Sequence, residues 1–150
     1  MKITLNPNAV EPQKRAALVA EGGFGKHYTD HMVVCEWNEK TGWGEPELKP
    51  YGPITLDPAT AVFHYGQEIF EGMKAYRQKD GGVALFRPDA NAQRFIRSAK
   101  RLALPELPEK LFIETVEALV KQDSGWVPDK VGESLYIRPF MFAKIGRAHV

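Results

Sequence analysis

The chain has 150 residues, with 20 Lys and Arg against 19 Asp and Glu, 43% hydrophobic residues and a single cysteine. This balance is typical of an ordinary globular domain that buries one core without needing a metal or a disulfide. The net charge of +1 gives no overall attraction to nucleic acid or anionic membrane, and no apolar run approaches the ~20 residues needed to span a bilayer. We therefore expect a cytoplasmic protein without nucleic-acid or membrane partners.

The first 28 residues are predicted to form an N-terminal arm. Prolines and glycines bracket one short helix-compatible stretch at 13–21. Residues 31–37 are β-prone, and the turn residues at 41–44 precede a second extended piece that is interrupted by prolines. This pattern predicts an antiparallel pair of strands. Residues 61–70 are apolar but ambiguous between helix and strand.

The middle of the chain predicts a hairpin followed by two helices. Segments 72–77 and 83–87 flank a glycine-containing turn at 79–82. After Pro88, with Asp89 as the N-cap, apolar residues recur at helical spacing as far as Ala103. A second helical stripe runs from Leu107 to Val120, with Pro108 tolerated in its first turn.

A last strand is predicted at 134–142, with Pro139 at an edge or a bulge. Strands, two helices and a further strand predict an α+β domain over 29–144, in which helices cover one face of a mainly antiparallel sheet.

The first predicted helix carries an unusually positive face. Five basic residues oppose only Asp89 between residues 86 and 103: Arg87, Arg94, Arg97, Lys100 and Arg101. Arg94 lies beside the apolar stripe, where its guanidinium could reach into a cleft and hold a phosphate bidentately. A solvated basic face is the alternative. Nucleic-acid binding would also need stacking aromatics, and only Phe95 is nearby.

The last strand offers a second candidate site. Because side chains alternate along a strand, Tyr136 and Arg138 share one face while Ile137 points to the other. A phenol beside a guanidinium can bind a carboxylate, although a plain surface edge strand is the alternative. Six aromatic residues are expected to pack in the core, with a ligand pocket as the alternative: Phe24, Tyr28, Phe63, Tyr65, Phe70 and Tyr76.

Other common chemistries find no support in the sequence. His27, His31 and His64 have no ligand spacing with Cys35, so no metal site is expected. The glycines at 22–25 precede a lysine but follow no strand, unlike a phosphate-binding loop. Glu68 lies in the ambiguous segment at 61–70 and Glu71 directly after it, so their conformation is uncertain and no acid or base role is assigned to them.

Four motifs carry a family resemblance. They are Phe-Gly-Lys-His-Tyr-Thr-Asp-His-Met at 24–32, His-Tyr-Gly-Gln-Glu-Ile-Phe-Glu-Gly-Met-Lys-Ala-Tyr at 64–76, Phe-Arg-Pro at 86–88 and Leu-Tyr-Ile-Arg-Pro at 135–139. In order and spacing they resemble branched-chain amino acid aminotransferases. The second motif alone would indicate the wider group of fold-type IV pyridoxal phosphate enzymes, and the first and last narrow it.

The resemblance implies a small N-terminal domain of such an enzyme, using pyridoxal 5'-phosphate. The enzyme exchanges an amino group between Leu, Ile or Val and 2-oxoglutarate, giving glutamate and branched-chain 2-oxo acids, and its relatives are homodimers. By resemblance, Arg94 grips the cofactor phosphate, and Tyr136 and Arg138 lie at the substrate carboxylate. Tyr65 and Phe70 match pocket-lining aromatics, and Tyr28 matches an aromatic that contacts the aliphatic side chain of the substrate.

The resemblance also implies that the chain as written is incomplete. The family's Schiff-base lysine and the carboxylate facing the pyridine nitrogen lie in a second domain, C-terminal to the last motif, and no lysine here matches the former. No catalytic residue is therefore assigned, and an inactive fragment is expected. Residues 145–150, Ile-Gly-Arg-Ala-His-Val, match a translated sequencing adaptor and are expected to be a non-native tail.

Two alternatives stay open. One is another fold-type IV aminotransferase or lyase, acting on D-amino acids or aminodeoxychorismate, against which the 24–32 motif argues. The other is a noncatalytic anion-binding module that uses the basic helix.

Overall fold

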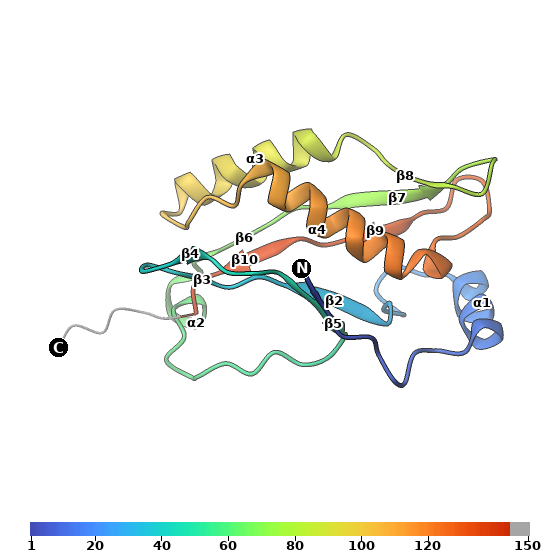
Figure 1. The fold of residues 1–150 in the computed structure, drawn as a ribbon, viewed down its shortest axis with the longest axis horizontal. Coiled ribbons are helices and arrows are strands. Elements are labelled where there is room, and N and C mark those ends of the chain that lie inside the picture. Colours follow the sequence, from blue (N-terminus) through green and yellow to red (C-terminus); the bar gives the residue numbers. More distant parts are fainter. Residues whose placement is uncertain (145–150) are drawn as a thin grey trace.

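The computed structural model describes residues 1–144. Figure 1 shows two long helices, α3 (Pro88–Arg101) and α4 (Glu109–Gln122), lying together over the strands. The expected α+β fold is confirmed, because the sheets are antiparallel apart from one short pair at the N-terminus. The proposed non-native tail at 145–150 lies outside the described residues.

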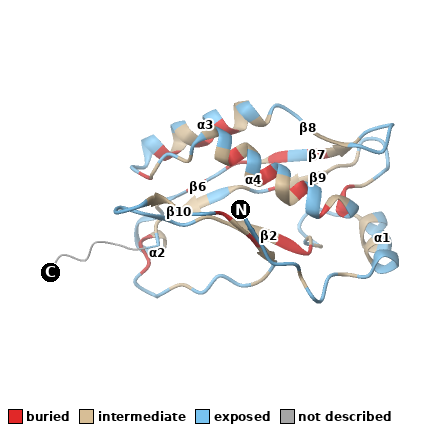
Figure 2. Ribbon diagram, in the orientation of Figure 1, coloured by how far each residue is buried: buried red, intermediate tan, exposed pale blue. Residues whose placement is uncertain are grey.

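The helices form where the apolar periodicity predicts them. Helix α3 buries Ala92, Phe95 and Ala99, and α4 buries residues at the same kind of spacing, among them Phe112 and Val116. The ring centroids of Phe95 and Phe112 lie 5.4 Å apart, and both residues belong to the hydrophobic core. Figure 2 shows that the buried positions of both helices gather on one side of each.

The predicted cap of α3 is wrong. The helix is preceded by Arg87, whose φ of 49° turns the chain sharply from strand into helix, and no side chain caps the helix. Asp89 lies inside the first turn, where its carboxylate interacts favourably with the positive end of the helix dipole. Pro108 likewise precedes α4 instead of lying within it.

The central strands form two small antiparallel sheets. Strand β7 (Met73–Arg77) pairs with β8 (Val83–Leu85) as the predicted hairpin, and with β9 (Leu135–Ile137) on its other side. Strand β10 (Phe140–Phe142) pairs with β6 (Glu68–Phe70). The strand predicted at 134–142 is therefore two strands in two sheets, because Pro139 interrupts the pairing between them.

The ambiguous segment at 61–70 contains both kinds of structure. A short helix, α2 (Ala61–Tyr65), ends at Gly66, whose φ of 59° lies in the left-handed region that glycine tolerates best. Strand β6 follows directly, so the change of direction at Gly66 separates the two.

The N-terminal third of the chain forms two further small sheets and one helix. Strand β5 (Glu47–Pro50) pairs in parallel with β1 (Lys2–Ile3) and antiparallel with β2 (His31–Val34), and β3 (Trp37–Asn38) pairs with β4 (Gly42–Trp43). Helix α1 (Pro12–Glu21) confirms the short predicted helix and buries no residue. It packs beside the short helix η1 (Ser124–Trp126) that follows α4. The division into an arm at 1–28 and a domain at 29–144 stays a prediction.

Within residues 1–144, none of the helices has the length and apolar character that a membrane crossing requires.

Candidate functional site

The face of the strands that turns away from α3 and α4 carries a cationic and aromatic cluster. Ile137 points into the core, so its neighbours Tyr136 and Arg138 share the opposite face, as the alternation predicts. The Arg138 guanidinium donates from Nε and Nη2 to the Tyr136 hydroxyl, at 3.0 and 2.7 Å. It also lies over the Phe70 ring, with Cζ 4.3 Å from the ring centroid. Two of the predicted site motifs therefore meet here.

This arrangement leaves both polar groups ready for a ligand. A hydroxyl oxygen has two lone pairs, and both face N–H groups of Arg138, so the hydroxyl proton of Tyr136 is left to donate outward. The guanidinium keeps one N–H group of Nη2 and both N–H groups of Nη1 for a further acceptor. A carboxylate could therefore receive a charged donor and a neutral donor side by side.

Gly72 and Phe24 complete the surroundings of Tyr136. A Cβ on Gly72 would lie 2.6 Å from the Tyr136 hydroxyl oxygen, so only glycine lets the phenol take this place. The Phe24 ring meets the Tyr136 ring edge-on at 5.0 Å. Loop residues near the N-terminus thus reach the same cluster.

A second polar cluster lies between β6 and α3. Arg94 on α3 donates from Nε and Nη2 to the two carboxylate oxygens of Glu71, at 2.7 and 2.6 Å. Asn91, one turn earlier, donates to the same carboxylate at 2.8 Å. Burial by itself would raise the pKa of Glu71, but these hydrogen bonds and the charge of Arg94 hold it below its ordinary value.

The sequence interpretation missed Glu71 as part of a site. Glu71 continues the buried alternation of Ile69 and Met73, so its side chain points toward the helices. A carboxylate at a buried position needs a partner, and the basic helix packed on that face supplies one. This alternation was an available signal that Glu71 is buried, but it does not identify the residue that pairs with Glu71.

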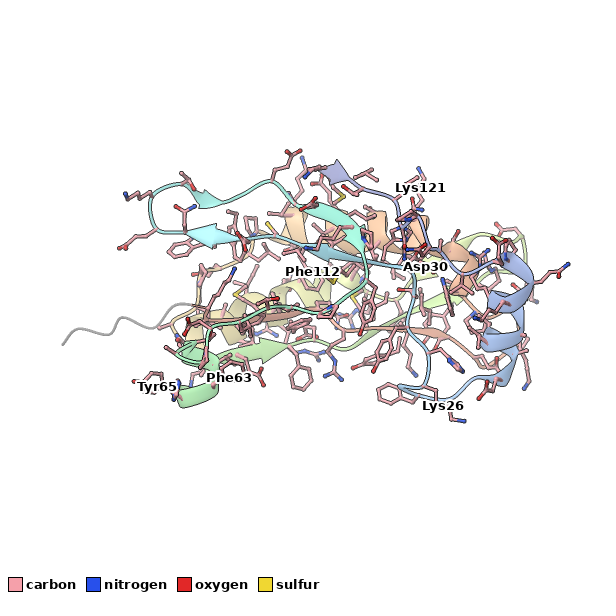
Figure 3. All side chains as sticks on the ribbon, turned by 90° about the horizontal axis from the view of Figure 1, so that it is seen from below. Lys26, Asp30, Phe63, Tyr65, Phe112 and Lys121 are labelled. Atoms are coloured by element: carbon pink, nitrogen blue, oxygen red, sulfur yellow. The ribbon has the colours of Figure 1, made fainter. Side chains whose placement is uncertain are left out.

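The expected packing of the aromatic residues in the core is wrong for most of them. Phe24, Tyr28, Phe63, Tyr65 and Phe70 are all at least 59% exposed, because the helices already fill the core side and these residues lie in loops, on α2 or on the open face. Tyr28 stacks on Tyr51, with the two ring centroids 5.1 Å apart. Figure 3 shows Phe63 and Tyr65 projecting from α2 at one end of the molecule.

The basic face of α3 is partly neutralised. Lys100 lies 3.4 Å from Glu106 in an exposed ion pair, and Arg94 is held by Glu71. Between residues 1 and 144, no recorded ion pair engages Arg87, Arg97 or Arg101. In the same range no group of three metal-ligating side chains comes together.

Comparison by sequence gives a consistent set of relatives, although no family model matches. The chain is 56% identical over 144 residues to a probable branched-chain-amino-acid aminotransferase of Streptomyces coelicolor, covering 94% of this chain and 40% of that protein. It is 52% identical over 142 residues to the branched-chain-amino-acid aminotransferase of Mycolicibacterium smegmatis, covering 94% of this chain and 39% of that protein. The chain thus spans about two fifths of the length of these relatives.

Solved structures agree in fold. A T.th. branched-chain amino acid aminotransferase complexed with N-(5'-phosphopyridoxyl)-L-glutamate superposes with a TM-score of 0.53 and 28% identity, over 63% of this chain and 30% of that chain. The T.th. enzyme with pyridoxamine 5'-phosphate gives a TM-score of 0.55 at 22% identity, over 77% and 33%. With the sequence identities above, these likenesses show that the chain belongs to the branched-chain-amino-acid aminotransferase family, in the N-terminal domain of its fold-type IV members.

Proposed function

We propose that this chain supplies the substrate-carboxylate and cofactor-phosphate contacts of a pyridoxal 5'-phosphate-dependent aminotransferase. The reaction moves an amino group between Leu, Ile or Val and 2-oxoglutarate, giving the branched-chain 2-oxo acid and glutamate. The activity is proposed for the whole protein, because the chain spans about 40% of a curated relative. The observation that carries the proposal is the hydrogen-bonded pair of Arg138 and Tyr136, in which the Arg138 guanidinium lies over the Phe70 ring. The relatives of the chain support the same assignment.

The residues present fit the phosphate end of the cofactor. Arg94 uses one N–H of Nε and one of Nη2 on Glu71, so an N–H of Nη2 and both of Nη1 remain for an anion. Its side chain is 59% exposed, so a phosphate can reach these donors. When bound, pyridoxal phosphate supplies the electron sink for charge at the substrate α-carbon.

The proposed task of the Arg138 cluster is to fix the substrate by its carboxylate. Arg138 offers the charge-assisted donors of Nη1, and the Tyr136 hydroxyl donates beside them. The Phe70 ring covers one face of the guanidinium and limits access of water there. In the second half-reaction, Arg138 would bind the distal carboxylate of glutamate.

The aromatic residues support a pocket for a branched aliphatic side chain. Phe70 lies at the carboxylate cluster, and we propose that Tyr28 and Tyr65 join the pocket in the whole protein. Leu, Ile and Val differ by a methylene or a branch point, which an apolar pocket discriminates by only ~1–3 kcal/mol. One pocket could therefore accept all three.

A homodimer is part of the same proposal. Phe63 and Tyr65 on α2 are 61% and 80% exposed, and a second copy of the protein would cover this apolar surface. A cytoplasmic location is also retained as a proposal, since the single thiol of Cys35 suits a reducing compartment.

The test is an assay of the whole protein, cloned from genomic DNA, for 2-oxoglutarate-dependent consumption of Leu, Ile and Val. D-alanine and aminodeoxychorismate serve as substrates for the other fold-type IV activities. We expect turnover of all three branched-chain amino acids and none of the other two substrates. Turnover of D-alanine or aminodeoxychorismate alone would overturn the proposal. The present chain, without a matching lysine, is expected to be inactive in the same assay.

The anion-binding module keeps one supporting observation, since the described residues give Arg87, Arg97 and Arg101 no ion-pair partner. It predicts binding of phosphate compounds and nucleic acid that weakens steeply with salt. Titrating an oligonucleotide at two salt concentrations decides the matter, because absence of binding at low salt removes this alternative.

A further inference from the structure

The Glu71 carboxylate lies at the junction of the two candidate clusters. Three consecutive residues of β6 and its end serve three different partners: the Phe70 ring contacts Arg138, Glu71 binds Arg94, and Gly72 leaves space for the Tyr136 hydroxyl. The Glu71 backbone N–H also donates, at 2.8 Å, to the carbonyl of Pro139, the residue that directly follows Arg138. The segment 70–72 therefore links both anion-binding arginines.

The contact between Glu71 and Arg94 is asymmetric in exposure. The side chain of Glu71 is 2% exposed, whereas that of Arg94 is 59% exposed. A buried carboxylate is costly unless it is fully paired, and here it accepts three side-chain hydrogen bonds, two from Arg94 and one from Asn91. The carboxylate is thus the fixed partner, and the arginine is the partner that reaches the surface.

The pairing also determines which edge of the guanidinium is free. Glu71 takes the side edge formed by Nε and Nη2. The end-on edge, with one N–H from Nη1 and one from Nη2, points away from that carboxylate by the planar geometry of the group. An anion that arrives from solvent finds two parallel donors in a fixed orientation.

We propose that Glu71 is a positioning residue for the cofactor phosphate: it holds Arg94 by its side edge so that the end-on edge receives the phosphate. This inference rests on the proposed function, which assigns the phosphate to Arg94. Because the Glu71–Arg94 pair has no net charge, phosphate binding here depends on donor orientation more than on net positive charge. Asn91 assists by fixing the carboxylate from the same helix.

The experiment compares two ligands that differ only in the phosphate. Affinities of the whole protein for pyridoxal 5'-phosphate and for pyridoxal are measured by spectroscopic titration, for the parent and for Glu71→Gln. The glutamine amide keeps the size of the side chain, but it has no charge and only one acceptor oxygen, so it cannot accept both Arg94 N–H groups as the carboxylate does. We expect affinity for the phosphate ester to fall about tenfold, with affinity for pyridoxal unchanged. Glu68→Gln, at an exposed position on β6, is the matched control and should change neither affinity.

Asn91→Ala provides a second variant that leaves the ion pair in place. It should give a smaller loss with the same selectivity for the phosphate ester. Equal losses for both ligands in Glu71→Gln would show a purely structural role and overturn the inference, as would no loss for either.

Arg94→Lys separates this inference from the proposed function. If Arg94→Lys lowers affinity for the phosphate ester and Glu71→Gln does not, only the positioning role of Glu71 fails. If Arg94→Lys leaves the ratio of the two affinities unchanged, the assignment of the phosphate to Arg94 fails, and the inference fails with it.

Discussion

His31 and Asp123 lie 92 residues apart in sequence, yet both oxygens of the Asp123 carboxylate are bound to His31. One accepts the His31 backbone N–H at 2.9 Å, and the other lies 2.6 Å from the ring Nδ1. The ring Nε2 accepts the backbone N–H of Asn6 at 2.9 Å, so Nδ1 carries the proton and donates to the carboxylate. The end of α4, the start of β2 and the N-terminal segment are thereby joined.

This relationship predicts a large stability loss on changing Asp123. Both partners are almost fully buried, so Asp123→Ala leaves two donors of His31 without an acceptor. We expect the free energy of unfolding in urea to fall by about 2–4 kcal/mol. Glu117→Ala, at an exposed position on α4, should change the free energy of unfolding by less than about 0.5 kcal/mol. Similar values for the two variants would show that the buried contact contributes little.

The fold could be predicted from the sequence where local rules decide it. Apolar spacing was sufficient for α3 and α4, and the turn at 79–82 was sufficient for the hairpin, since both depend on neighbours in sequence. The split at Pro139 was anticipated only as an edge or bulge. The pairing of β9 with β7 and of β10 with β6 depends on contacts between residues far apart in sequence, which local rules do not address.

The candidate site was predictable to a similar degree. Alternation alone placed Tyr136 and Arg138 on one face, because it depends on strand geometry. The partner of Arg94 was not predictable in this way, since Glu71 is 23 residues away and directly follows the segment whose conformation was ambiguous. The exposure of Phe70 depends on which face the helices cover, which composition does not reveal.

The lowered pKa of Glu71 predicts a loss of stability in acid. A carboxyl group whose pKa is lower in the folded than in the unfolded state contributes stability that is complete above the unfolded-state pKa. That contribution is lost as the pH falls through the folded-state pKa. We therefore expect the free energy of unfolding to decrease between about pH 5 and pH 3, and to decrease less in Glu71→Gln. Urea midpoints measured across this range test it, with Glu117→Gln as an exposed control. Parallel curves for the parent and Glu71→Gln would contradict the prediction.

The close approach at Gly72 predicts that Gly72→Ala disturbs substrate binding. Its Cβ would lie 2.6 Å from the Tyr136 hydroxyl oxygen and 3.3 Å from ring carbons, so the ring has to move off Arg138. We expect a stability loss of about 1–3 kcal/mol and a raised KM for branched-chain amino acids in the whole protein. Gly52→Ala is the matched control, because nothing lies within 4 Å of its Cβ. A KM equal to that of the Gly52 variant would show that the hydroxyl position is unimportant.

Arg138 predicts different outcomes for a charge-keeping and a charge-removing substitution. Arg138→Ala removes the cation and exposes the Phe70 ring, so we expect KM for leucine and for 2-oxoglutarate to rise about 10–100-fold. Arg138→Lys keeps the charge but has no planar fork, so it cannot donate twice to Tyr136 and still bind a carboxylate from a fixed direction. It should recover only part of the loss.

Tyr136→Phe completes the comparison, because it keeps the ring and removes only the hydroxyl. If the hydroxyl donates to substrate, Tyr136→Phe raises KM in the parent, while in Arg138→Ala the same change has a smaller effect, since the hydroxyl there has already lost the contacts that orient it. Steady-state kinetics on the four proteins give the coupling between the two residues. Strictly additive effects would mean that Arg138 and Tyr136 act independently, against the arrangement of the two donors in the structure.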